Sequence, residues 1–405
     1  MQLEFIDGGV VAVPGFLASG VHCGIRKNRT KRDLALILAD VECNAAAVYT
    51  LNKVKAAPIW LTMENLQNNR AQGIIVNSGN ANACAPGGME AARKTVEAVA
   101  IETGLKADSF IVNSTGVIGQ PLPVDAIVEA VPKLVKQLGK DEDTVSEAIM
   151  TTDTFPKSFA VKVEIGGKTV TIGGVAKGSG MIHPNMATML AFLTTDCNID
   201  AGLLHEVLSK STWETYNRIS VDGDTSTNDM TAILASGGAG NDKIVDKGKD
   251  YESFLYALNA INLNLAKAIA RDGEGATKLI TCKLTGASTL EDAVSIAKSV
   301  ISSSLLKAAM FGKDANWGRV LCAMGYAEAQ FNPDNVDVAF SSEAGVVQVC
   351  KKSEGLPFDE ELALEILSKD EVTIEVTLYE GTAEANAYGC DLTYDYVKIN
   401  GDYRT

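Results

Sequence analysis

A glycine-linked hairpin is the sequence feature that most constrains the fold of this chain. The stretch "FAVKVEIGGKTVTIGGVAKGSG", residues 159–180, contains two runs of alternating apolar and polar residues joined by Gly166 and Gly167. This pattern predicts two antiparallel strands with a tight turn. The hairpin leads into "TMLAFLTTDC", residues 188–197, which is typical of a buried strand. Thr188 at its start is either an ordinary strand residue bonded to backbone or a reacting hydroxyl.

The remaining sequence predicts a mixture of helices and strands. Apolar residues spaced three and four apart predict helices, and alternation or short apolar runs predict strands. With 405 residues and 46% apolar content, the chain can bury one large or two medium cores, and it shows no internal repeat or obvious linker. Helices are predicted at 88–102, 123–138, 201–217, 251–270 and 289–309, and strands at 33–40, 45–50, 73–79, 109–114, 318–327, 335–341, 371–381 and 384–400.

Charge and cysteine content exclude several classes of partner. A formal charge of -15 disfavours nonspecific binding to nucleic acid or to an anionic membrane. The eight cysteines are scattered singly with no CxxC pair, as expected of reduced thiols in a cytoplasmic protein. The first residues, "MQLEFIDGGVVAVPGFLASG", lack a basic leader, and their apolar run is broken by Gly and Pro. We therefore expect a cytoplasmic location with no membrane partner.

Two loops resemble phosphate-binding or calcium-binding motifs but fail on spacing. In "GGVAKGSG" Lys177 precedes Gly178 instead of following the last Gly, so it is not a phosphate-binding loop. "DGDTSTND" has Thr227 where a calcium loop needs Gly and Ile233 where it needs Glu. No GxGxxG follows a predicted strand, and only three histidines are available for a metal or a catalytic triad. The sequence therefore predicts no metal and no cofactor, which favours acyl transfer by a hydroxyl nucleophile.

Thr188 can supply both nucleophile and base if the preceding peptide bond is cut. Cleavage between Ala187 and Thr188 would free an α-amino group whose ordinary pKa is about 7.7–8.0, and this group can accept the hydroxyl proton. The same hydroxyl can attack the carbonyl of Ala187 and leave an ester that water hydrolyses. His183 is the only histidine nearby, and we interpret it as loop structure.

Several ordered motifs resemble the ornithine acetyltransferase (glutamate N-acetyltransferase) family of arginine biosynthesis, of the bifunctional ArgJ type. They are "NSTGVIG", "TTDTFPK", "KGSGMIHPNMATML", "DGDTSTND", "DGEGATK", "DANWGR" and "NGDYRT", with "IRKNRTKRDLALI" and "NSGNANACAPGG" extending the likeness towards the N-terminus. The resemblance implies an α+β fold, an αββα sandwich related to N-terminal-nucleophile hydrolases. It also implies self-cleavage into an α chain, residues 1–187, and a β chain, residues 188–405, that assemble as an α2β2 heterotetramer.

The resemblance also assigns the site. Thr188 matches the nucleophile and Ala187 the residue before the cut, while Thr115 and Gly116 match the oxyanion-stabilising pair. A glycine suits that role because its backbone can approach a tetrahedral intermediate closely. The substrate-binding positions that the family implies are Thr154, Lys177, Thr188, Glu274, Asn400 and Thr405.

The implied activity is acetyl transfer from N2-acetyl-L-ornithine to L-glutamate through an acetyl-threonine ester, a step that exchanges one amide for another and needs no cofactor. Some family members also use acetyl-CoA as the donor, and the sequence leaves both donors open. The alternatives are a threonine-nucleophile amidohydrolase or aminopeptidase, in which water resolves the acyl-enzyme, and a noncatalytic amino-acid-binding protein.

Overall fold

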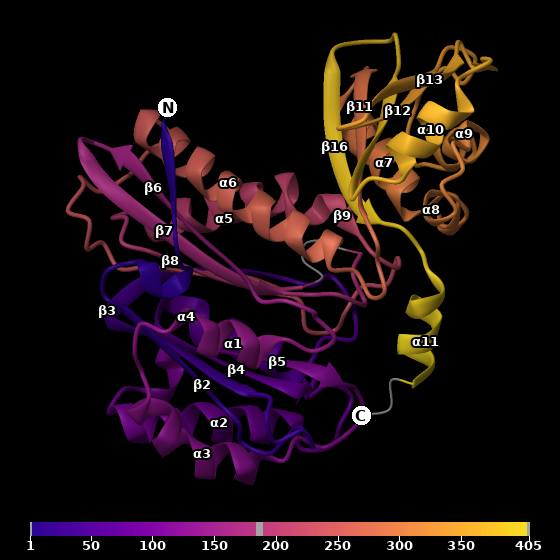
Figure 1. Ribbon diagram of the computed structural model, residues 1–405. Coiled ribbons are helices and arrows are strands. Elements are labelled where there is room, and N and C mark those ends of the chain that lie inside the picture. The colour runs from indigo at the N-terminus through magenta and orange to yellow at the C-terminus, as the bar shows by residue number, and fades with distance from the viewer. Residues whose placement is uncertain (1, 184–188, 403–405) are drawn as a thin grey trace.

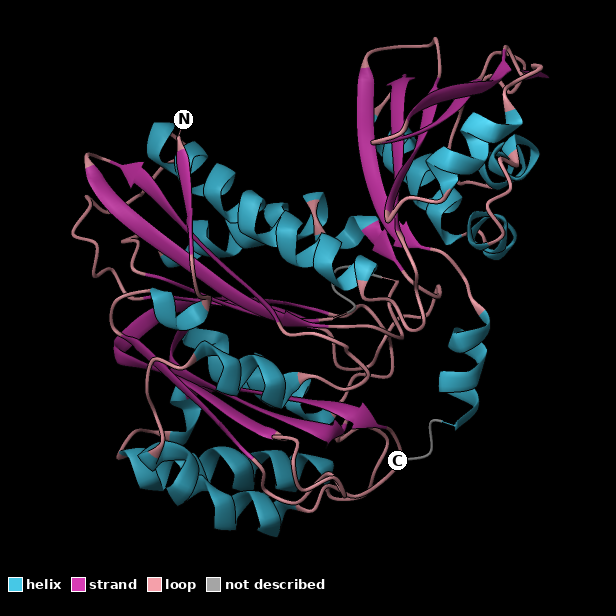
Figure 2. Ribbon diagram, viewed as in Figure 1, coloured by secondary structure: helices cyan, strands magenta, loops and turns pink. Residues whose placement is uncertain are grey.

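The chain folds into two lobes of helices and mixed sheets, as the computed structural model shows (Figures 1 and 2). The structure describes residues 2–183 and 189–402. The large lobe is formed by residues up to 278 and the small lobe by residues 279–390, after which the chain returns along the large lobe. The α+β fold class predicted from the sequence is confirmed.

The large lobe is built on a nine-stranded sheet of order β1-β6-β7-β8-β10-β3-β4-β5, with β2 beside β3. The predicted hairpin is present as β6 and β7, which pair from Lys157 with Ala176 to Ile165 with Lys168. The strands are β1 (Leu3–Ile6), β2 (Phe16–Val21), β3 (Leu34–Tyr49), β4 (Arg70–Asn80), β5 (Phe110–Val117), β6 (Lys157–Ile165), β7 (Lys168–Lys177), β8 (Leu190–Thr195) and β10 (Met230–Ala235).

Strand β3 belongs to both halves of this sheet and connects them. We predicted separate strands at 33–40 and 45–50, which is wrong because one strand runs through both. Its first half pairs with β2 and its second half with β10. The pairing with β4 shifts register between Leu38 and Cys43, and such an irregularity bends a strand. The two halves of the sheet therefore form two β layers (Figure 1).

Helices cover both outer faces of these layers. α5 and α6 lie on the layer that holds β6, β7 and β8, and α2 and α3 lie on the layer that holds β4 and β5 (Figure 1). The predicted α-β-β-α order is therefore present, with α4 between the two β layers. The helices are α1 (Ala57–Asn65), α2 (Gly88–Thr103), α3 (Val124–Lys136), α4 (Glu142–Ile149), α5 (Ala201–Glu214) and α6 (Lys249–Arg271), with 3-10 turns at Val10–Ala12, Leu66–Asn68, Ala107–Ser109 and Tyr216–Arg218.

The small lobe has a seven-stranded sheet of order β14-β13-β12-β15-β11-β16-β9. Its edge strand β9 comes from the large lobe and pairs with β16, so the two lobes share this sheet. The elements are β9 (Ile219–Ser220), β11 (Leu279–Ala287), β12 (Asp337–Ser342), β13 (Gly345–Lys351), β14 (Glu354–Gly355), β15 (Glu371–Thr377), β16 (Ala383–Cys390), α7 (Leu290–Ser302), α8 (Ser304–Phe311), α9 (Trp317–Gly325) and α10 (Glu360–Leu367), followed by α11 (Tyr394–Asp402).

Two predicted elements in this region are wrong in type. The stretch at 318–327 forms helix α9 instead of a strand, because its buried residues Val320, Ala323 and Met324 are spaced three and four apart. The side chain of Asn316 caps this helix by accepting a hydrogen bond from the Arg319 amide. The stretch at 384–400 begins as strand β16 but ends as helix α11.

The helix predicted at 289–309 is two helices bent by 57°. Ser303 ends α7 and caps α8, where its hydroxyl accepts a hydrogen bond from the Leu306 amide at 3.3 Å. Among the described residues, no single helix is long and apolar enough to cross a membrane. The bent pair α7–α8 passes that test by length and composition, and it supplies buried residues to the core of the small lobe.

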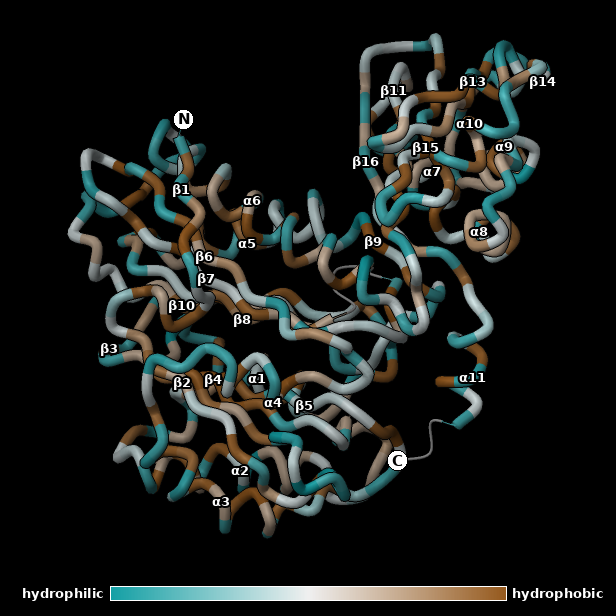
Figure 3. The backbone as a smooth tube through the Cα atoms, viewed as in Figure 1, coloured by the Kyte–Doolittle hydropathy of each residue, from teal (hydrophilic) through white to brown (hydrophobic). Residues whose placement is uncertain are grey.

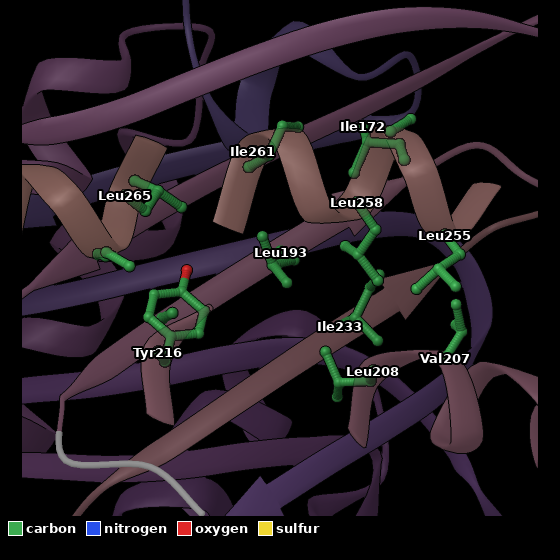
Figure 4. Packing of buried hydrophobic residues seen from close by; sticks show 14 of the residues in the cluster. Ile172, Leu193, Val207, Leu208, Tyr216, Ile233, Leu255, Leu258, Ile261 and Leu265 are labelled. Atoms are coloured by element: carbon green, nitrogen blue, oxygen red, sulfur yellow. The ribbon is translucent and has the colours of Figure 1, made fainter. Parts of the chain in front are cut away.

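The core between α5, α6 and the sheet is a continuous apolar layer. Figure 4 shows Leu258 of α6 pointing toward Ile233 of β10, with Ile261 and Leu193 beside them. In Figure 3 strand β8 is coloured largely as apolar. This layer fixes α6, and the end of α6 leads directly into the loop that carries Glu274.

We predict that Leu258→Ala destabilises the large lobe by about 2–5 kcal/mol, because it opens a cavity in a layer where Leu258 is fully buried. The matched control is Leu305→Ala, on a helix position that is 63% exposed. Urea unfolding followed by circular dichroism measures both. Equal unfolding midpoints for the two variants would contradict this account of the core.

Candidate active site

A cavity of about 140 Å³ lies where β5 and β7 end and β8 and β10 begin. Five predicted site residues from distant parts of the chain line it: Thr115, Gly116, Lys177, Glu274 and Asn400. Loop residues Thr151, Thr152, Gly180, Met181, Ile182, Ser226, Thr227, Asn228 and Asp229 complete most of the wall. We call this cavity the acyl pocket.

The predicted nucleophile Thr188, the cleavage residue Ala187 and Thr405 lie outside the described residues. Met189, the residue after Thr188, lines the acyl pocket. Its carbonyl accepts a hydrogen bond from the Met230 amide at 3.0 Å. The start of the predicted β chain is therefore hydrogen-bonded to β10 at the pocket wall.

Gly116 is forced to be glycine by a close backbone approach. Its φ of +136° lies where side chains are rarely tolerated, and a Cβ atom there would lie 2.3 Å from the carbonyl carbon of Gly79. Gly116 and Gly79 face each other on the parallel strands β5 and β4. This packing holds the Thr115–Gly116 backbone in one place, as an oxyanion-binding role requires.

Buried asparagine side chains form hydrogen bonds to the backbone next to Thr115. The side-chain amide of Asn228 donates to the carbonyls of Ala81 at 2.6 Å and Ser114 at 2.9 Å. The Asn113 side chain returns a bond to the carbonyl of Asn228 at 3.0 Å. Because these groups are buried and paired, the wall that carries Thr115 is joined rigidly to the loop before β10.

A buried ion cluster lies behind Lys177. The Lys157 ammonium group contacts Asp153 at 2.8 Å and Asp272 at 2.6 Å, with all three side chains almost fully buried. Asp153 also accepts the Gly178 amide at 2.7 Å and lies 3.9 Å from the Lys177 ammonium group. Burial alone would raise the pKa of Asp153, but the Lys177 and Lys157 ammonium groups hold it well below its usual range. Asp153 therefore stays ionised and anchors the loop after β7.

Lys177 and Asp229 are two buried ionisable residues of the pocket wall. Burial lowers the pKa of Lys177, although the carboxylates of Asp153, Asp229 and Glu274 oppose this. Burial raises the pKa of Asp229 well above its usual range, with Lys177 opposing. Among the residues that the structure describes, one carboxylate oxygen of Asp229 has no hydrogen-bond partner. A carboxylate bound in the pocket would compensate for the desolvation of the Lys177 ammonium group by forming an ion pair with it. This part of the wall is therefore suited to an anion.

Glu274 supplies the opposite charge. Its carboxylate accepts a hydrogen bond from the side chain of Asn400 on α11 at 2.6 Å, and its amide donates to the Ser179 carbonyl at 3.1 Å. A Cβ on Gly180 would lie 2.4 Å from this carboxylate, so a larger residue there would displace the Glu274 side chain. The pocket thus presents a cation and an anion from separate loops, an arrangement that suits the carboxylate and ammonium groups of an amino acid.

Thr154 is the one described site prediction that does not line the acyl pocket. It is exposed, and both its amide and its hydroxyl donate to the carboxylate of Asp272. Its proposed contact with substrate stays a prediction. His183 also lies outside the pocket lining, and its ring nitrogen lies 3.0 Å from the Ser220 hydroxyl. Burial lowers the pKa of His183 to about 4, which fits a structural role.

Sequence reasoning missed Asn228, Asp229, Asp153, Lys157 and Asp272. The first two end the motif "DGDTSTND" and stand directly before a strand, a place where polar side chains are held at a sheet edge. The others belong to "TTDTFPK" and "RDGEGATK", where the sequence predicted only Thr154 and Glu274 as site residues. Within residues 2–183 and 189–402, no group of three or more His, Cys, Asp or Glu side chains could hold a metal ion.

Fold and pocket together define an enzyme for acyl transfer between amino acids. The profile of the ArgJ family matches residues 17–405, so the chain belongs to the ArgJ family.

Two relatives are similar in sequence over 98–100% of this chain, and one solved structure is similar over part of it. The arginine biosynthesis bifunctional protein ArgJ of Symbiobacterium thermophilum is 50% identical over 406 residues, covering 100% of both chains. The protein of the same description from Clostridium acetobutylicum, ArgJ 1, is 50% identical over 98% of this chain and 97% of its own. A solved structure of arginine biosynthesis bifunctional protein ArgJ from Bacillus halodurans is 47% identical, covers 52% of this chain and 98% of its own, and has a TM-score of 0.49.

We predict that Asp153→Asn destabilises the protein by about 3–5 kcal/mol at pH 7, because it leaves Lys157 in the core with one partner fewer. The folded-state pKa of Asp153 is depressed, so its contribution is complete above its unfolded pKa of about 3.9 and is lost as the pH falls below that value. The difference between wild type and variant should therefore begin to shrink near about pH 4 and should continue to shrink as the pH falls towards the depressed folded-state pKa of Asp153.

Chemical unfolding at several pH values measures this difference. The control is Asp108→Asn, which changes an exposed aspartate and should leave both the stability and its pH dependence close to wild type. A stability difference that stays constant down to pH 3 would show that the charge of Asp153 is unimportant.

Proposed function

We propose that the protein transfers acetyl from N2-acetyl-L-ornithine to L-glutamate, with Thr188 as the nucleophile after cleavage of the Ala187–Thr188 bond. The observation that carries this proposal is the acyl pocket, which gathers Thr115, Gly116, Lys177 and Glu274 beside the start of β8. Membership of a family whose relatives are described as arginine biosynthesis proteins supports the same conclusion.

Substrate binding follows from the two charged walls. Lys177 pairs with the α-carboxylate of the amino acid, and Glu274, oriented by Asn400, pairs with a substrate ammonium group. Ornithine and glutamate share an α-carboxylate, so one cation can hold both in turn. The acetyl group then lies against Thr115 and Gly116.

The chemistry proceeds in two balanced steps. The Thr188 hydroxyl attacks the acetyl carbon while the freed α-amino group takes its proton. The Gly116 amide and the Thr115 hydroxyl donate hydrogen bonds to the oxyanion, the C–N bond breaks, and ornithine leaves with that proton. The glutamate amine then attacks the acetyl-threonine ester and passes its proton to the α-amino group, which returns it to the Thr188 oxygen as the ester C–O bond breaks.

The sheet explains how two chains could stay together after the cut. In the sheet, β7 pairs with β8 and β3 pairs with β10, so β8 and β10 of the proposed β chain lie between strands of the proposed α chain. We propose residues 1–187 and 188–405 as the two chains and an α2β2 assembly as their state. A cytoplasmic location and the absence of a cofactor belong to the same proposal.

The decisive assay incubates the purified protein with N-acetylornithine, with and without glutamate. We expect N-acetylglutamate and ornithine in equal amounts, with initial-rate patterns of the ping-pong type. Release of acetate at the same rate without glutamate would instead indicate an amidohydrolase and would overturn the transferase. No reaction with either mixture would leave only a binding protein.

Self-cleavage has its own test by intact mass. We expect wild type to give two fragments that separate between residues 187 and 188, and Thr188→Ala to give one full-length chain. Thr188→Ser retains a hydroxyl and is the matched control, which should still be cut, at a lower rate. An uncut wild type that nevertheless transfers acetyl would show that the base is another group.

A further inference from the structure

A separate cavity, of about 310 Å³, lies where the small lobe meets the loop after β7. Helix α7 supplies one wall through residues 295, 298, 299 and 302, whose spacing places them on one face of the helix. His183 supplies the side that belongs to the large lobe, and residues 326–328, which follow α9, complete the lining. Helix α7 also packs against β9 and β16, the two strands through which the lobes share a sheet. We call this space the interlobe cavity.

Lys298 brings an amine to the wall of the interlobe cavity. Its side chain is partly buried, and its neighbours on the helix, Ala297 and Ile301, pack in the core of the small lobe. Burial lowers the pKa of Lys298 from its ordinary value of 10.5 to about 8. About half of this amine is therefore uncharged near pH 8, whereas an ordinary lysine is almost fully protonated there. An uncharged amine in a solvent-open cavity is a nucleophile.

His183 is held in place in the same cavity. Its carbonyl accepts a hydrogen bond from the Thr225 hydroxyl at 2.9 Å, and its ring nitrogen Nδ1 lies 3.0 Å from the Ser220 hydroxyl on β9. Burial and the positive charge of Lys298 lower the pKa of His183 to about 4, so the imidazole is neutral at pH 7. When Nδ1 accepts the hydrogen bond from Ser220, the ring proton is on Nε2, which can then donate a hydrogen bond.

The remaining groups of the wall indicate which electrophile suits the amine. Ser295 and Tyr326 contribute hydroxyl groups, and Glu328 contributes a carboxylate. The ionisable residues of the lining are therefore His183, Lys298, Tyr326 and Glu328. Because of Glu328 and a chain charge of -15, an anionic electrophile such as an acyl phosphate is disfavoured. Two hydroxyl groups and an imidazole, by contrast, suit a modification that leaves a small anion on the amine.

We propose that Lys298 reacts with carbon dioxide in the interlobe cavity to form a carbamate. Carbon dioxide is neutral and small, so neither the charge of the protein nor the size of the cavity excludes it. The uncharged amine forms a C–N bond to the carbon atom, one C=O π pair moves to oxygen, and an amine proton passes to solvent. No other reactant and no leaving group is needed. The product is an anion, which Ser295, Tyr326 and Nε2 of His183 stabilise as hydrogen-bond donors.

The first test traps the carbamate on the full wild-type protein. Triethyloxonium converts a carbamate into a stable ethyl ester, which peptide mass spectrometry locates. At a fixed pressure of carbon dioxide we expect the ester on Lys298, in a yield that rises from about pH 7 to about pH 8 because only the uncharged amine reacts. Lysines surrounded by solvent should carry at least about tenfold less ester, since an ordinary lysine amine is mostly protonated at this pH.

Two variants test the assignment to Lys298. Lys298→Arg keeps a cation of similar length but has no amine that becomes uncharged, so the ester should disappear. Lys168→Arg makes the same change at an exposed lysine outside the cavity lining and should keep the ester on Lys298. Thermal unfolding checks each fold, and Lys298→Gln replaces the arginine variant if that variant unfolds.

The pKa of His183, followed by NMR, gives a second readout that a merely structural lysine would not move. The Lys298 ammonium group lowers this pKa, whereas a carbamate places a negative charge in the same cavity. Carbon dioxide should therefore raise the pKa of His183 in wild type and in Lys168→Arg, and leave it unchanged in Lys298→Arg. The chain contains only three histidines, so comparison with His183→Gln assigns the signal.

The two readouts together decide the proposal. No ester on Lys298 in wild type, or equal yields on Lys298 and on exposed lysines, overturns it. An ester on Lys298 without a change in the pKa of His183 also overturns it, since the carbamate would then lie outside the interlobe cavity. The ester and the rise in the pKa of His183, both lost in Lys298→Arg and kept in Lys168→Arg, support it. Failure of the acetyl-transfer assay does not bear on this result, because the carbamate does not use the acyl pocket.

Discussion

The position of β8 between β7 and β10 is the constraint on which the site depends. Leu190 pairs with Lys177 on one side and with Met230 on the other. This register places the cation of the acyl pocket, the first described residue after the predicted cut and the polar loop before β10 at one edge of the sheet. A register shift of one residue would turn every side chain of β8 to the opposite face of the sheet. It would remove the apolar side chains of β8 from the core under α6, which would be energetically costly.

Buried polar side chains then hold the loops at that edge of the sheet in fixed positions. Lys157 joins Asp153 to Asp272, Asn228 joins β5 to the loop before β10, and Asn400 holds Glu274 from the last helix. The contacts of Lys157 with Asp272, of Asn228 with Ser114 and of Asn400 with Glu274 connect segments that are distant in sequence. Because unpaired groups would be costly in such surroundings, the loops move little relative to one another, which is the preorganisation that an acyl-transfer site needs.

Prediction from the sequence succeeded where local pattern and tertiary environment agree. The hairpin at Gly166–Gly167, helix α2 and strand β12 follow their expected periods closely. It failed for α9, where glycine and β-branched residues obscured a helical spacing, and for β3, where a register shift let one strand run through an expected break. The spacing of apolar residues does not indicate whether a neighbouring strand can pair across a β-bulge. It also does not indicate whether a residue such as Asn316 caps a helix.

The sequence by itself determined the motif order that marks the ArgJ family. It also predicted Thr188 as the nucleophile and Lys177 and Glu274 as substrate contacts of opposite charge. Only the tertiary structure decided which residues meet and in what state. The contact between Lys157 and Asp272 spans 115 positions, and no local pattern indicates it. The same burial that brings such residues together removes water from them, so pKa values, partners and the interlobe cavity beside His183 follow from packing, which the sequence specifies only through the complete fold.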